Sequence, residues 1–297
     1  MLRFVVSLLL AITLASSSLE AGRSGVGIQP CQSLGGPPPI TADDGAYCTT
    51  YTYFNALTQG YAMQQPFMAA NAVILAGTHS QSMSINTGTF PNGTGWSWTW
   101  PATYSGGFPY AFYDVILGDS GGFTTVQGAG HPLATQISKI GTLTTTLNIS
   151  YTDPDAVCSV DFTGNSDIIY DLWLTSVPYS NARANPNSIL FEIEVFVHTN
   201  FTPTSATTFT ITEGARSWTA YEYPGNVGND QRWIVTTGSD ILSGTINLNT
   251  ILQAFTAHGV TTGNEYIAGV PFGLETYCNS GTLTVTGLSY VWQNNAP

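Results

Sequence analysis

Two glutamates in the segment 191–198 could support catalysis by their type and spacing. Successive side chains of an extended chain point to opposite faces, so Glu192, Glu194, Phe196 and His198 share the face that the apolar residues between them leave free. Two carboxyl groups can act as nucleophile and proton donor in hydrolysis. An ordinary solvent-facing strand is the alternative, because charged residues are mostly exposed. In a chain with 8% charged residues, two carboxylates beside a phenylalanine favour the floor of a cleft.

A third glutamate, Glu275, has the surroundings that a general acid requires. If the segment 270–278 is extended, Glu275 shares a face with Tyr277. An aromatic neighbour removes water from a carboxyl group and so raises its pKa. A glutamate in a surface loop is the other interpretation of this segment.

An aspartate interrupts the apolar segment 168–174. Alternation places Asp171 and Trp173 on one face and the apolar neighbours on the other. A buried carboxylate is costly unless it is hydrogen-bonded, and a protonated glutamate would satisfy it. Asp171 is therefore a candidate partner of the catalytic glutamates, unless it simply faces water.

Three tryptophans at alternate positions of the segment 96–100 share one strand face. A row of indole rings suits an extended glycan, whereas core packing is the usual place for tryptophan. We expect some of these rings and several side chains near the carboxylates to contact substrate. The expected substrate-binding residues are Trp98, Trp100, Glu194, Phe196, Trp173 and Tyr277.

The balance of charges limits the choice of ligand. The formal net charge is −12, and Lys139 is the only lysine. Nucleic acids and anionic membranes attract clusters of Lys and Arg, so neither is an expected partner. The four histidines lack the spacing of metal ligands, so we expect no metal and no cofactor. A neutral polysaccharide is the expected partner, and nothing demands more than a monomer.

The first residues have the layout of a secretory signal peptide, which we place at 1–21. Arg3 precedes an apolar run over 4–14, and small residues follow it. The run is short for a bilayer span, although a membrane anchor is the alternative. Residues 22–42 form a Gly/Pro-rich segment, and 43–297 have the size of one large all-β domain. We therefore expect a secreted, extracellular protein.

Four cysteines fit an oxidising compartment, because they lack the close paired spacing of a zinc site. They predict two disulfides in one of three connectivities, among which the sequence does not choose. The four are Cys31, Cys48, Cys158 and Cys278. Glycosylation sequons at Asn92, Asn148 and Asn200 support secretion only weakly, since such triplets arise by chance in a Thr-rich chain.

The elements that must position these side chains are mostly strands. Short runs of Thr, Val, Ile and aromatic residues alternate along the chain and are broken by Gly, Asn, Asp and Pro. Apolar faces are clear at alternate positions of 143–151, 189–197 and 283–285. This succession predicts an all-β fold with two sheets packed as a sandwich or jelly roll.

One segment has helical spacing instead. Its apolar residues recur every three or four positions before Gly259, which predicts a single helix over 249–258 packed against the outside of a sheet. Those apolar residues are Leu248, Ile251, Leu252 and Phe255.

Taken in order, these motifs resemble glycoside hydrolase family 12, the endoglucanase and xyloglucanase family. The family's nucleophile strand, Tyr-Glu-Leu/Ile-Met-Ile-Trp-Leu, resembles 191–197, and its acid/base motif, Gly-Thr-Glu-Pro-Phe, resembles 273–277. Its Tyr-Asp-Leu/Ile strand resembles 170–172, its Trp-x-Trp strand 98–100, and its N-terminal Tyr-Cys 47–48. The resemblance extends from about residue 45 to the end. Each short motif alone is a weak signal, but several motifs in the same order as in the family are much more specific.

The resemblance implies a concanavalin A-like β-jelly roll with one short helix, and retaining hydrolysis of β-1,4-glucans without a metal. It implies Glu192 as nucleophile, Glu275 as acid/base and Asp171 as the residue hydrogen-bonded to the nucleophile. This mechanism requires carboxyl groups about 5–5.5 Å apart.

The chain departs from the family pattern close to these glutamates. Glu194 stands where the family has Met, Phe196 where it has Trp, and Thr276 where it has Pro. The added carboxylate would raise the pKa of its neighbour. It also leaves open a register in which Glu194 is the nucleophile, although the flanking apolar pattern favours Glu192.

Other functions use the same architecture. Jelly rolls host lectins as well as hydrolases, so a binding protein without activity is one alternative, and an interaction protein that has lost catalysis is another. The presence of both Glu192 and Glu275 favours the enzyme, because a binding protein needs no matched pair. A xylanase of the sister family shares the fold, but its motifs around the two glutamates are not found here.

Overall fold

A computed structural model describes most of the chain beyond residue 50. The described residues are 51–52, 61–68, 80–84, 89, 91–100, 111–118, 134–153, 166–178, 188–200, 202–224, 231–267 and 269–295. The predicted signal peptide, the Gly/Pro-rich segment and three of the four cysteines lie outside these residues, so their boundaries and pairing stay predictions. Cys278, the one cysteine inside them, is buried and disulfide-bonded.

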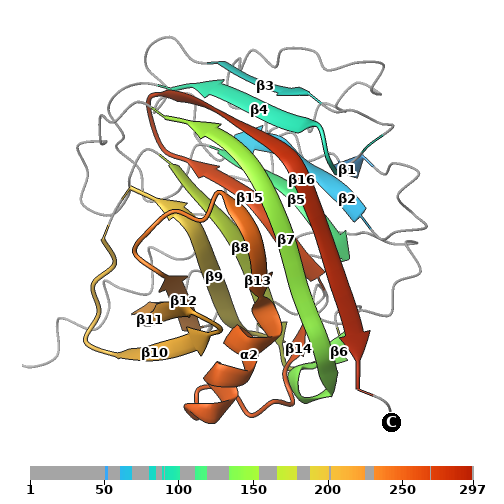
Figure 1. Ribbon diagram of the computed structural model, residues 1–297, viewed down its shortest axis with the longest axis vertical. Coiled ribbons are helices and arrows are strands. Elements are labelled where there is room, and N and C mark those ends of the chain that lie inside the picture. Colours follow the sequence, from blue (N-terminus) through green and yellow to red (C-terminus); the bar gives the residue numbers. More distant parts are fainter. Residues whose placement is uncertain are drawn as a thin grey trace, which may run out of the picture.

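The described strands form two sheets that pack face to face (Figure 1). The path of the larger sheet runs in the order β1 (Tyr51–Thr52), β2 (Tyr61–Met68), β5 (Ala111–Gly118), β15 (Gly269–Thr276), β8 (Ser166–Thr175), β9 (Ile189–Thr199), β12 (Gln231–Thr236), β11 (Arg216–Pro224) and β10 (Thr208–Glu213). The short strands β6 (Thr135–Gln136) and β14 (Tyr266–Ile267) join it beside β8. Neighbours on the path run antiparallel except β9 and β12, which run parallel.

The smaller sheet covers the middle of the larger one (Figure 1). Its order is β13 (Ser243–Asn247), β7 (Ile140–Thr152), β16 (Ser280–Asn294), β4 (Thr94–Thr99) and β3 (Ser80–Ser84). This two-sheet arrangement is the predicted β-jelly-roll sandwich.

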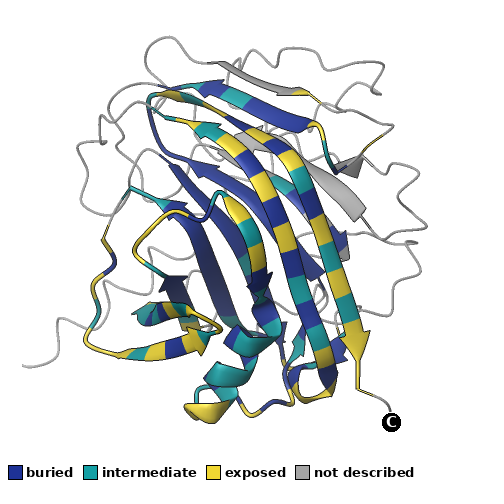
Figure 2. Cartoon of the chain, viewed as in Figure 1, coloured by how far each residue is buried: buried dark blue, intermediate teal, exposed yellow. Residues whose placement is uncertain are grey.

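Burial follows the predicted alternation. Figure 2 shows β7 and β16 alternating between buried and exposed residues, whereas β8, β9 and β15 are buried along most of their length. The predicted apolar faces of β7 and β16, including Leu143, Leu147 and Leu283, lie in the main core. Strands buried on both faces occupy the centre of a sheet, so β8, β9 and β15 are where a sandwich can hold buried polar side chains.

The helix α2 (Leu248–Ala257) lies where the sequence predicts it, and it is the only α-helix among the described residues. Asn247 caps it by accepting a hydrogen bond from the Thr250 backbone N–H at 3.1 Å. Its four predicted apolar residues are all buried in the main core. Gly259 ends the helix with a φ of 73°, which favours glycine. A short 3₁₀ turn, η3 (Ile137–Lys139), packs beside it.

The two faces of the larger sheet have different neighbours. Tyr170 of β8 points toward the smaller sheet, because its hydroxyl lies 2.9 Å from Thr145 Oγ1 of β7. A second apolar cluster, separate from the main core, consists of Ile169, Phe196, Ile234 and Tyr223. Since side chains alternate, this cluster and Asp171 lie on the face directed away from the smaller sheet, which we call the distal face.

A β-bulge changes the direction of side chains near the end of β9. Phe196 pairs with Ile169, but His198 pairs with Ile168, so one residue of β9 has no partner. The ring of His198 therefore contacts Tyr151 of β7, with centroids 4.4 Å apart. The prediction that His198 shares a face with the two glutamates is wrong, because strict alternation ends at the bulge.

Candidate active site

The predicted nucleophile strand brings two carboxylates to the distal face. Glu192 and Glu194 pair across the ladder with Trp173 and Asp171 of β8. Glu192 is 5% exposed and Glu194 is 1% exposed. Two buried carboxylates on one strand are costly unless a cation or hydrogen-bond donors compensate them.

Arg232 of β12 supplies that compensation. The parallel pairing of β9 and β12 sets Arg232 beside Glu192, and its side chain reaches diagonally to Glu194. Its Nε and Nη2 donate to the two carboxylate oxygens of Glu194, both at 2.8 Å, and its Nε lies 4.0 Å from Glu192 Oε2. Glu194 is thus held by a bidentate pair, which is the strong form of arginine–carboxylate contact.

The predicted acid/base residue, Glu275, comes to the same face from β15. It pairs with Asp167 of β8. The β8 partner of Glu194 is Asp171, four residues along the strand, and the partner of Glu192 is Trp173, six residues along. The Tyr277 hydroxyl donates to Glu275 Oε2 at 2.6 Å. Glu275 is 9% exposed, and the expected closeness of Glu275 and Tyr277 is confirmed.

Burial and mutual repulsion shift the protonation of this group of carboxyls. Burial, and then the charge of Glu194, raise the pKa of Glu275 to about 8, against the lowering effects of Arg232 and of the Tyr277 hydrogen bond. Burial, followed by the charges of Glu194 and Asp171, holds the pKa of Glu192 well above its ordinary value. One arginine cannot neutralise so many carboxylates, so part of the group keeps its protons.

Asp171 lies next to these glutamates but has a different partner from the predicted one. Its Oδ2 accepts a hydrogen bond from Trp173 Nε1 at 2.5 Å, and its buried Oδ1 has no hydrogen-bond partner among the described residues. The pKa of Asp171 is raised, first by burial and then by the charges of Glu194, Asp114 and Glu275. Trp173 thus lies beside these carboxyls as the donor to Asp171, and its contact with substrate stays a prediction.

Phe196 and the predicted tryptophans divide between the two faces. Phe196 packs in the cluster on the distal face, beside the carboxylates. Trp98 and Trp100 are 2% and 3% exposed and belong to the main core, where Trp100 Nε1 donates to Thr276 Oγ1 at 2.9 Å. The structure therefore does not bring these two indoles to the carboxylates, and they occupy the core position that was the alternative.

Three functional neighbours went unnoticed in the sequence. Arg232 is one of only six Lys and Arg residues in the chain. Its position two residues before Ile234 places both side chains on one strand face, and this was the available signal. Asp167 is 2% exposed opposite Glu275, and burial raises its pKa to about 7. Asp114 of β5 pairs with Gly273, two positions from Glu275. Each aspartate lacked a motif that would single it out.

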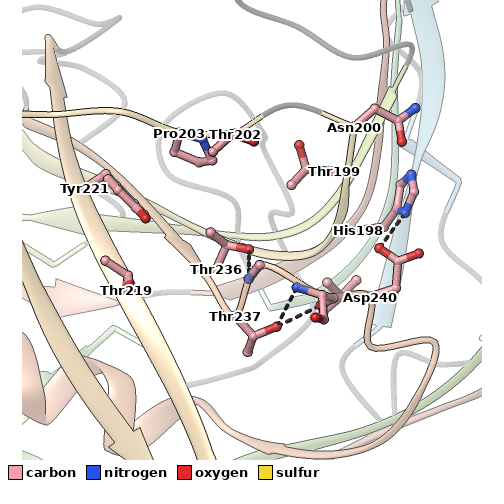
Figure 3. Close-up of a pocket in the computed structure, with 13 residues that line it drawn as sticks. His198, Thr199, Asn200, Thr202, Pro203, Thr219, Tyr221, Thr236, Thr237 and Asp240 are labelled. Carbon is pink, nitrogen blue, oxygen red and sulfur yellow. Dashed lines mark hydrogen bonds and ion pairs between the residues drawn. The ribbon is translucent and has the colours of Figure 1, made fainter. Parts of the chain in front are cut away.

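A separate cavity of about 310 Å³ lies at the C-terminal ends of β9 and β12 (Figure 3). Most of its lining side chains are polar and uncharged. Those with hydroxyl groups are Thr199, Thr202, Thr219, Tyr221, Thr236, Thr237 and Ser239. Besides Tyr221, the ionisable lining residues are His198 and Asp240, which contact each other at 2.9 Å.

Among the residues that the structure describes, no group of three or more His, Cys, Asp or Glu side chains is arranged to hold a metal ion. Within the same residues, no helix has the length and hydropathy needed to cross a bilayer.

Comparison with known proteins identifies the fold. No protein-family model and no curated protein sequence matches the chain. Among solved structures, a family 12 xyloglucanase from Bacillus licheniformis matches with a TM-score of 0.64 and 17% identity, over 86% of this chain and 100% of that one. Endoglucanase 3 of family GH12 from Trichoderma harzianum matches with a TM-score of 0.58 and 18% identity, over 88% and 100%.

A third similar structure is an endoglucanase from Rhodothermus marinus, with a TM-score of 0.60 and 13% identity, over 87% of this chain and 99% of that one. At such identities the likeness establishes the fold. The chain therefore has the fold of family 12 glycoside hydrolases, over nearly the whole length of the matched proteins.

Proposed function

We propose that this chain is a secreted retaining endo-hydrolase of β-1,4-glucans. The observation that carries the proposal is the group of buried glutamates that β9 and β15 bring to one face, where the charges of Glu194 and Arg232 act on both Glu192 and Glu275. The residues match the two glutamates of the family motifs, and the fold is that of family 12. Structures with this fold include a xyloglucanase and endoglucanases, which supports a β-1,4-glucan as substrate.

Glu192 and Glu275 would act in two steps. In the first, ionised Glu192 attacks the anomeric carbon while Glu275 gives its proton to the leaving oxygen, so the glycosidic bond breaks and a glycosyl ester forms. In the second, Glu275 takes a proton from a water molecule, which attacks the same carbon and releases Glu192. A pKa of about 8 keeps Glu275 protonated at neutral pH, as the first step requires.

Several observations bear on the choice between Glu192 and Glu194 as nucleophile. Both oxygens of Glu194 accept hydrogen bonds from Arg232, which reduces their availability for attack and favours Glu192. On the other side, Glu194 is the charge that acts most strongly on Glu275. Glu194 also stands nearer to Glu275, because its partner Asp171 is four residues along β8 from Asp167 whereas the partner of Glu192, Trp173, is six. We keep Glu192 because it occupies the nucleophile position of the family motif, and the Glu194→Gln variant tests the alternative.

Asp171 would support the nucleophile as a protonated acid. Its raised pKa favours the protonated form, and its Oδ1 lacks a partner among the described residues. A proton there could be donated to Glu192, which would help that carboxylate to ionise.

The predicted route to the cell exterior agrees with this activity. The signal-peptide layout of residues 1–21 and the acidic, lysine-poor composition suit a secreted enzyme whose substrate is uncharged. A disulfide at Cys278 suits an oxidising compartment.

The test is an assay of the secreted full chain on mixed-linkage β-glucan, xyloglucan and xylan, with reducing ends measured. Glu192→Gln and Glu275→Gln are compared with Glu194→Gln, and with Glu222→Gln of β11 as a matched control. We expect activity on a β-1,4-glucan that Glu275→Gln lowers by about 10²–10⁴-fold and Glu192→Gln abolishes. The control is expected to keep wild-type activity.

Other outcomes assign the roles differently. Loss in Glu194→Gln with activity in Glu192→Gln would make Glu194 the nucleophile. Binding of these glycans without cleavage would favour the carbohydrate-binding alternative. The anomer of the first product, followed by NMR, should be the β form of the substrate, and the α form would indicate inversion.

A further inference from the structure

We propose that Asn148 is a site of N-glycosylation on the face that the smaller sheet turns away from the larger one, which we call the outer face. Asn148, Ile149 and Ser150 form a glycosylation sequon on β7. Alternation turns Ile149 to the core and leaves Asn148 and Ser150 exposed. The proposal rests on the predicted signal peptide and is independent of hydrolytic activity.

Small neighbours leave room for a sugar around the Asn148 amide. Asn148 pairs with Ser243 of β13 on one side and with Gly287 of β16 on the other. Gly287 has no side chain, and a Cβ placed there would lie 3.4 Å from the Asn148 Cβ. The Asn148 carbonyl accepts from Thr286 Oγ1 at 2.8 Å, but its side-chain amide makes no hydrogen bond to any described residue. Nδ2 can therefore carry a sugar without breaking a hydrogen bond of the described fold.

The sequon at Asn92 is more constrained. Asn92 Oδ1 accepts a hydrogen bond from the Leu288 backbone N–H at 2.6 Å, which fixes the amide against β16. Thr94, the hydroxyl residue of this sequon, is fully buried in β4. A bulky glycan needs open solvent at its attachment point, so Asn92 suits it less than Asn148 does.

The sequon at Asn200 lies in a crowded polar cluster. Asn200 Nδ2, the atom that would carry the sugar, donates to Asp153 Oδ2 at 3.2 Å. Tyr151 and Ser166 donate to the same oxygen at 2.6 and 2.9 Å. Asn200 and Thr202 also line the cavity at the end of β9 (Figure 3). A glycan at Asn200 would have to disturb these contacts or enter the cavity.

The modification transfers an oligosaccharide from a lipid diphosphate carrier of the secretory pathway. Asn148 Nδ2 forms a bond to the anomeric carbon of the first N-acetylglucosamine, and it gives one proton to a base of the transferring enzyme. The bond from that carbon to the phosphate oxygen breaks, and the lipid diphosphate leaves with the electron pair. Transfer takes place before the chain folds, so the folded structure decides which modified asparagine is tolerated.

A glycan at Asn148 would stand on the opposite side of the sandwich from the proposed cleavage site. Figure 2 shows exposed positions along β7 and β16, and none of the exposed residues of β7, β13 and β16 is charged. In a chain with 8% charged residues, a hydrophilic glycan adds solubility to this neutral face. The carboxylates lie on the distal face of the other sheet, so the glycan would not obstruct a bound polymer.

The test is a peptide map of the full chain, produced in yeast with the predicted signal peptide retained. An endoglycosidase that leaves one N-acetylglucosamine marks each modified asparagine, and mass spectrometry measures the modified fraction at each sequon. We expect the mark on most copies of the Asn148 peptide and on few copies of the peptides with Asn92 or Asn200.

Changes to the third residue of the sequon test the assignment without altering the asparagine. Ser150→Ala should abolish the modification, because the sequon needs a hydroxyl there, and Ser150→Thr should keep it. Ser289→Ala removes an exposed hydroxyl from β16 and should leave the modified fraction unchanged. Asn148→Gln should also lose the mark, and circular dichroism checks that each variant is folded.

The proposal is overturned if Asn148 is unmodified in the chain that the yeast produces, or if Ser150→Ala keeps the modified fraction of the parent. Equal modification of all three sequons would also reject it, because the structure would then not select among them. The peptide map requires no catalysis, so this proposal and the proposed hydrolysis can fail separately.

Discussion

The distal face of the larger sheet has two regions that differ in how they treat charge. The carboxylate region holds Glu192, Glu194, Glu275 and Asp171 around Arg232, its one guanidinium among the described residues, and its two β9 glutamates are at most 5% exposed. The cavity at the C-terminal ends of β9 and β12, which we call the hydroxyl cavity, is lined mostly by neutral side chains and by one ion pair. Catalysis by carboxyl groups needs charges kept from water, whereas the wall of the cavity offers mostly neutral donors and acceptors.

An apolar cluster lies beside both regions. Its members Ile234 and Phe196 pair with Glu194 and Thr236, whereas Glu275 lies beyond the cluster, opposite Asp167. The bulge of β9 follows directly after Phe196. The cluster keeps water from the carboxylates, which strengthens their interactions. Because of the bulge, the His198 ring contacts Tyr151 of β7 and does not point to the distal face with the two glutamates.

The largest effect expected from this difference is the loss of Arg232. Arg232→Leu leaves Glu194 buried without its cation, which should lower the free energy of unfolding by about 3–5 kcal/mol. Urea denaturation at pH 7 measures this change. Replacing both partners, in Arg232→Leu with Glu194→Leu, should recover part of the loss, because Glu194 then leaves no unpaired charge while Glu192 still loses its contact with Arg232 at 4.0 Å.

Arg216→Leu is the matched control for that experiment. Arg216 pairs with Glu213 at 3.1 Å but is 30% exposed, so the loss should stay below about 1 kcal/mol for the ion pair. Equal losses in Arg216→Leu and Arg232→Leu would mean that the carboxylate region does not depend on buried charge, and the contrast between the regions would fail.

The second effect is a decrease of stability with rising pH. Glu275 has a folded pKa of about 8, above its ordinary value of 4.5, so the folded state binds the proton more tightly than the unfolded state. Its contribution is complete below pH 4.5 and is lost as the pH rises to 8. Over that range we expect a loss on the order of 3 kcal/mol.

Two variants assign this pH dependence to one region. Glu275→Gln should reduce the slope of unfolding free energy between pH 5 and 8, because the amide does not titrate, whereas Asp167 and the other carboxyls with raised pKa values keep part of the slope. Tyr221→Phe, in the hydroxyl cavity, should follow the wild-type slope. If the slope were the same in wild type and Glu275→Gln, this carboxyl would not be the group that titrates.

Alternation along single strands was enough to predict the sandwich and the two catalytic candidates. The apolar faces of β7, β9 and β16 and the four buried residues of α2 lie as predicted, because these patterns are local. Arg232 escaped prediction, since its contact with Glu194 depends on a parallel pairing between strands 38 residues apart.

Two other predictions failed for related reasons. Alternation groups Trp98 and Trp100 on one face but cannot tell whether that face is the core, which is where they lie. It also assumes an unbroken strand, and the bulge after Phe196 reverses the direction of His198. Both outcomes depend on neighbouring strands that the local sequence does not specify.

A smaller effect is expected from the donor of Asp171. Trp173→Phe removes the Nε1–H that Asp171 Oδ2 accepts at 2.5 Å, while Oδ1 has no partner among the described residues. Leaving a buried carboxyl without a donor should cost about 1–3 kcal/mol. Trp292→Phe is the control, because its Nε1 donates to Asn294 in an exposed position and its loss should cost less. If the two variants lose equal free energy of unfolding, burial does not make the hydrogen bond of Asp171 more stabilising than an exposed one.

The smallest effect should come from the ion pair of the hydroxyl cavity. Asp240→Asn removes the charge that His198 faces at 2.9 Å, but the Asp240 side chain is 49% exposed. Water competes for such a pair, so the free energy of unfolding should fall by less than about 1 kcal/mol. Urea denaturation of Asp240→Asn beside Arg232→Leu compares the two regions directly. A loss as large as that of Arg232→Leu would make the cavity a second region whose stability depends on charge, and the contrast between the two regions would fail.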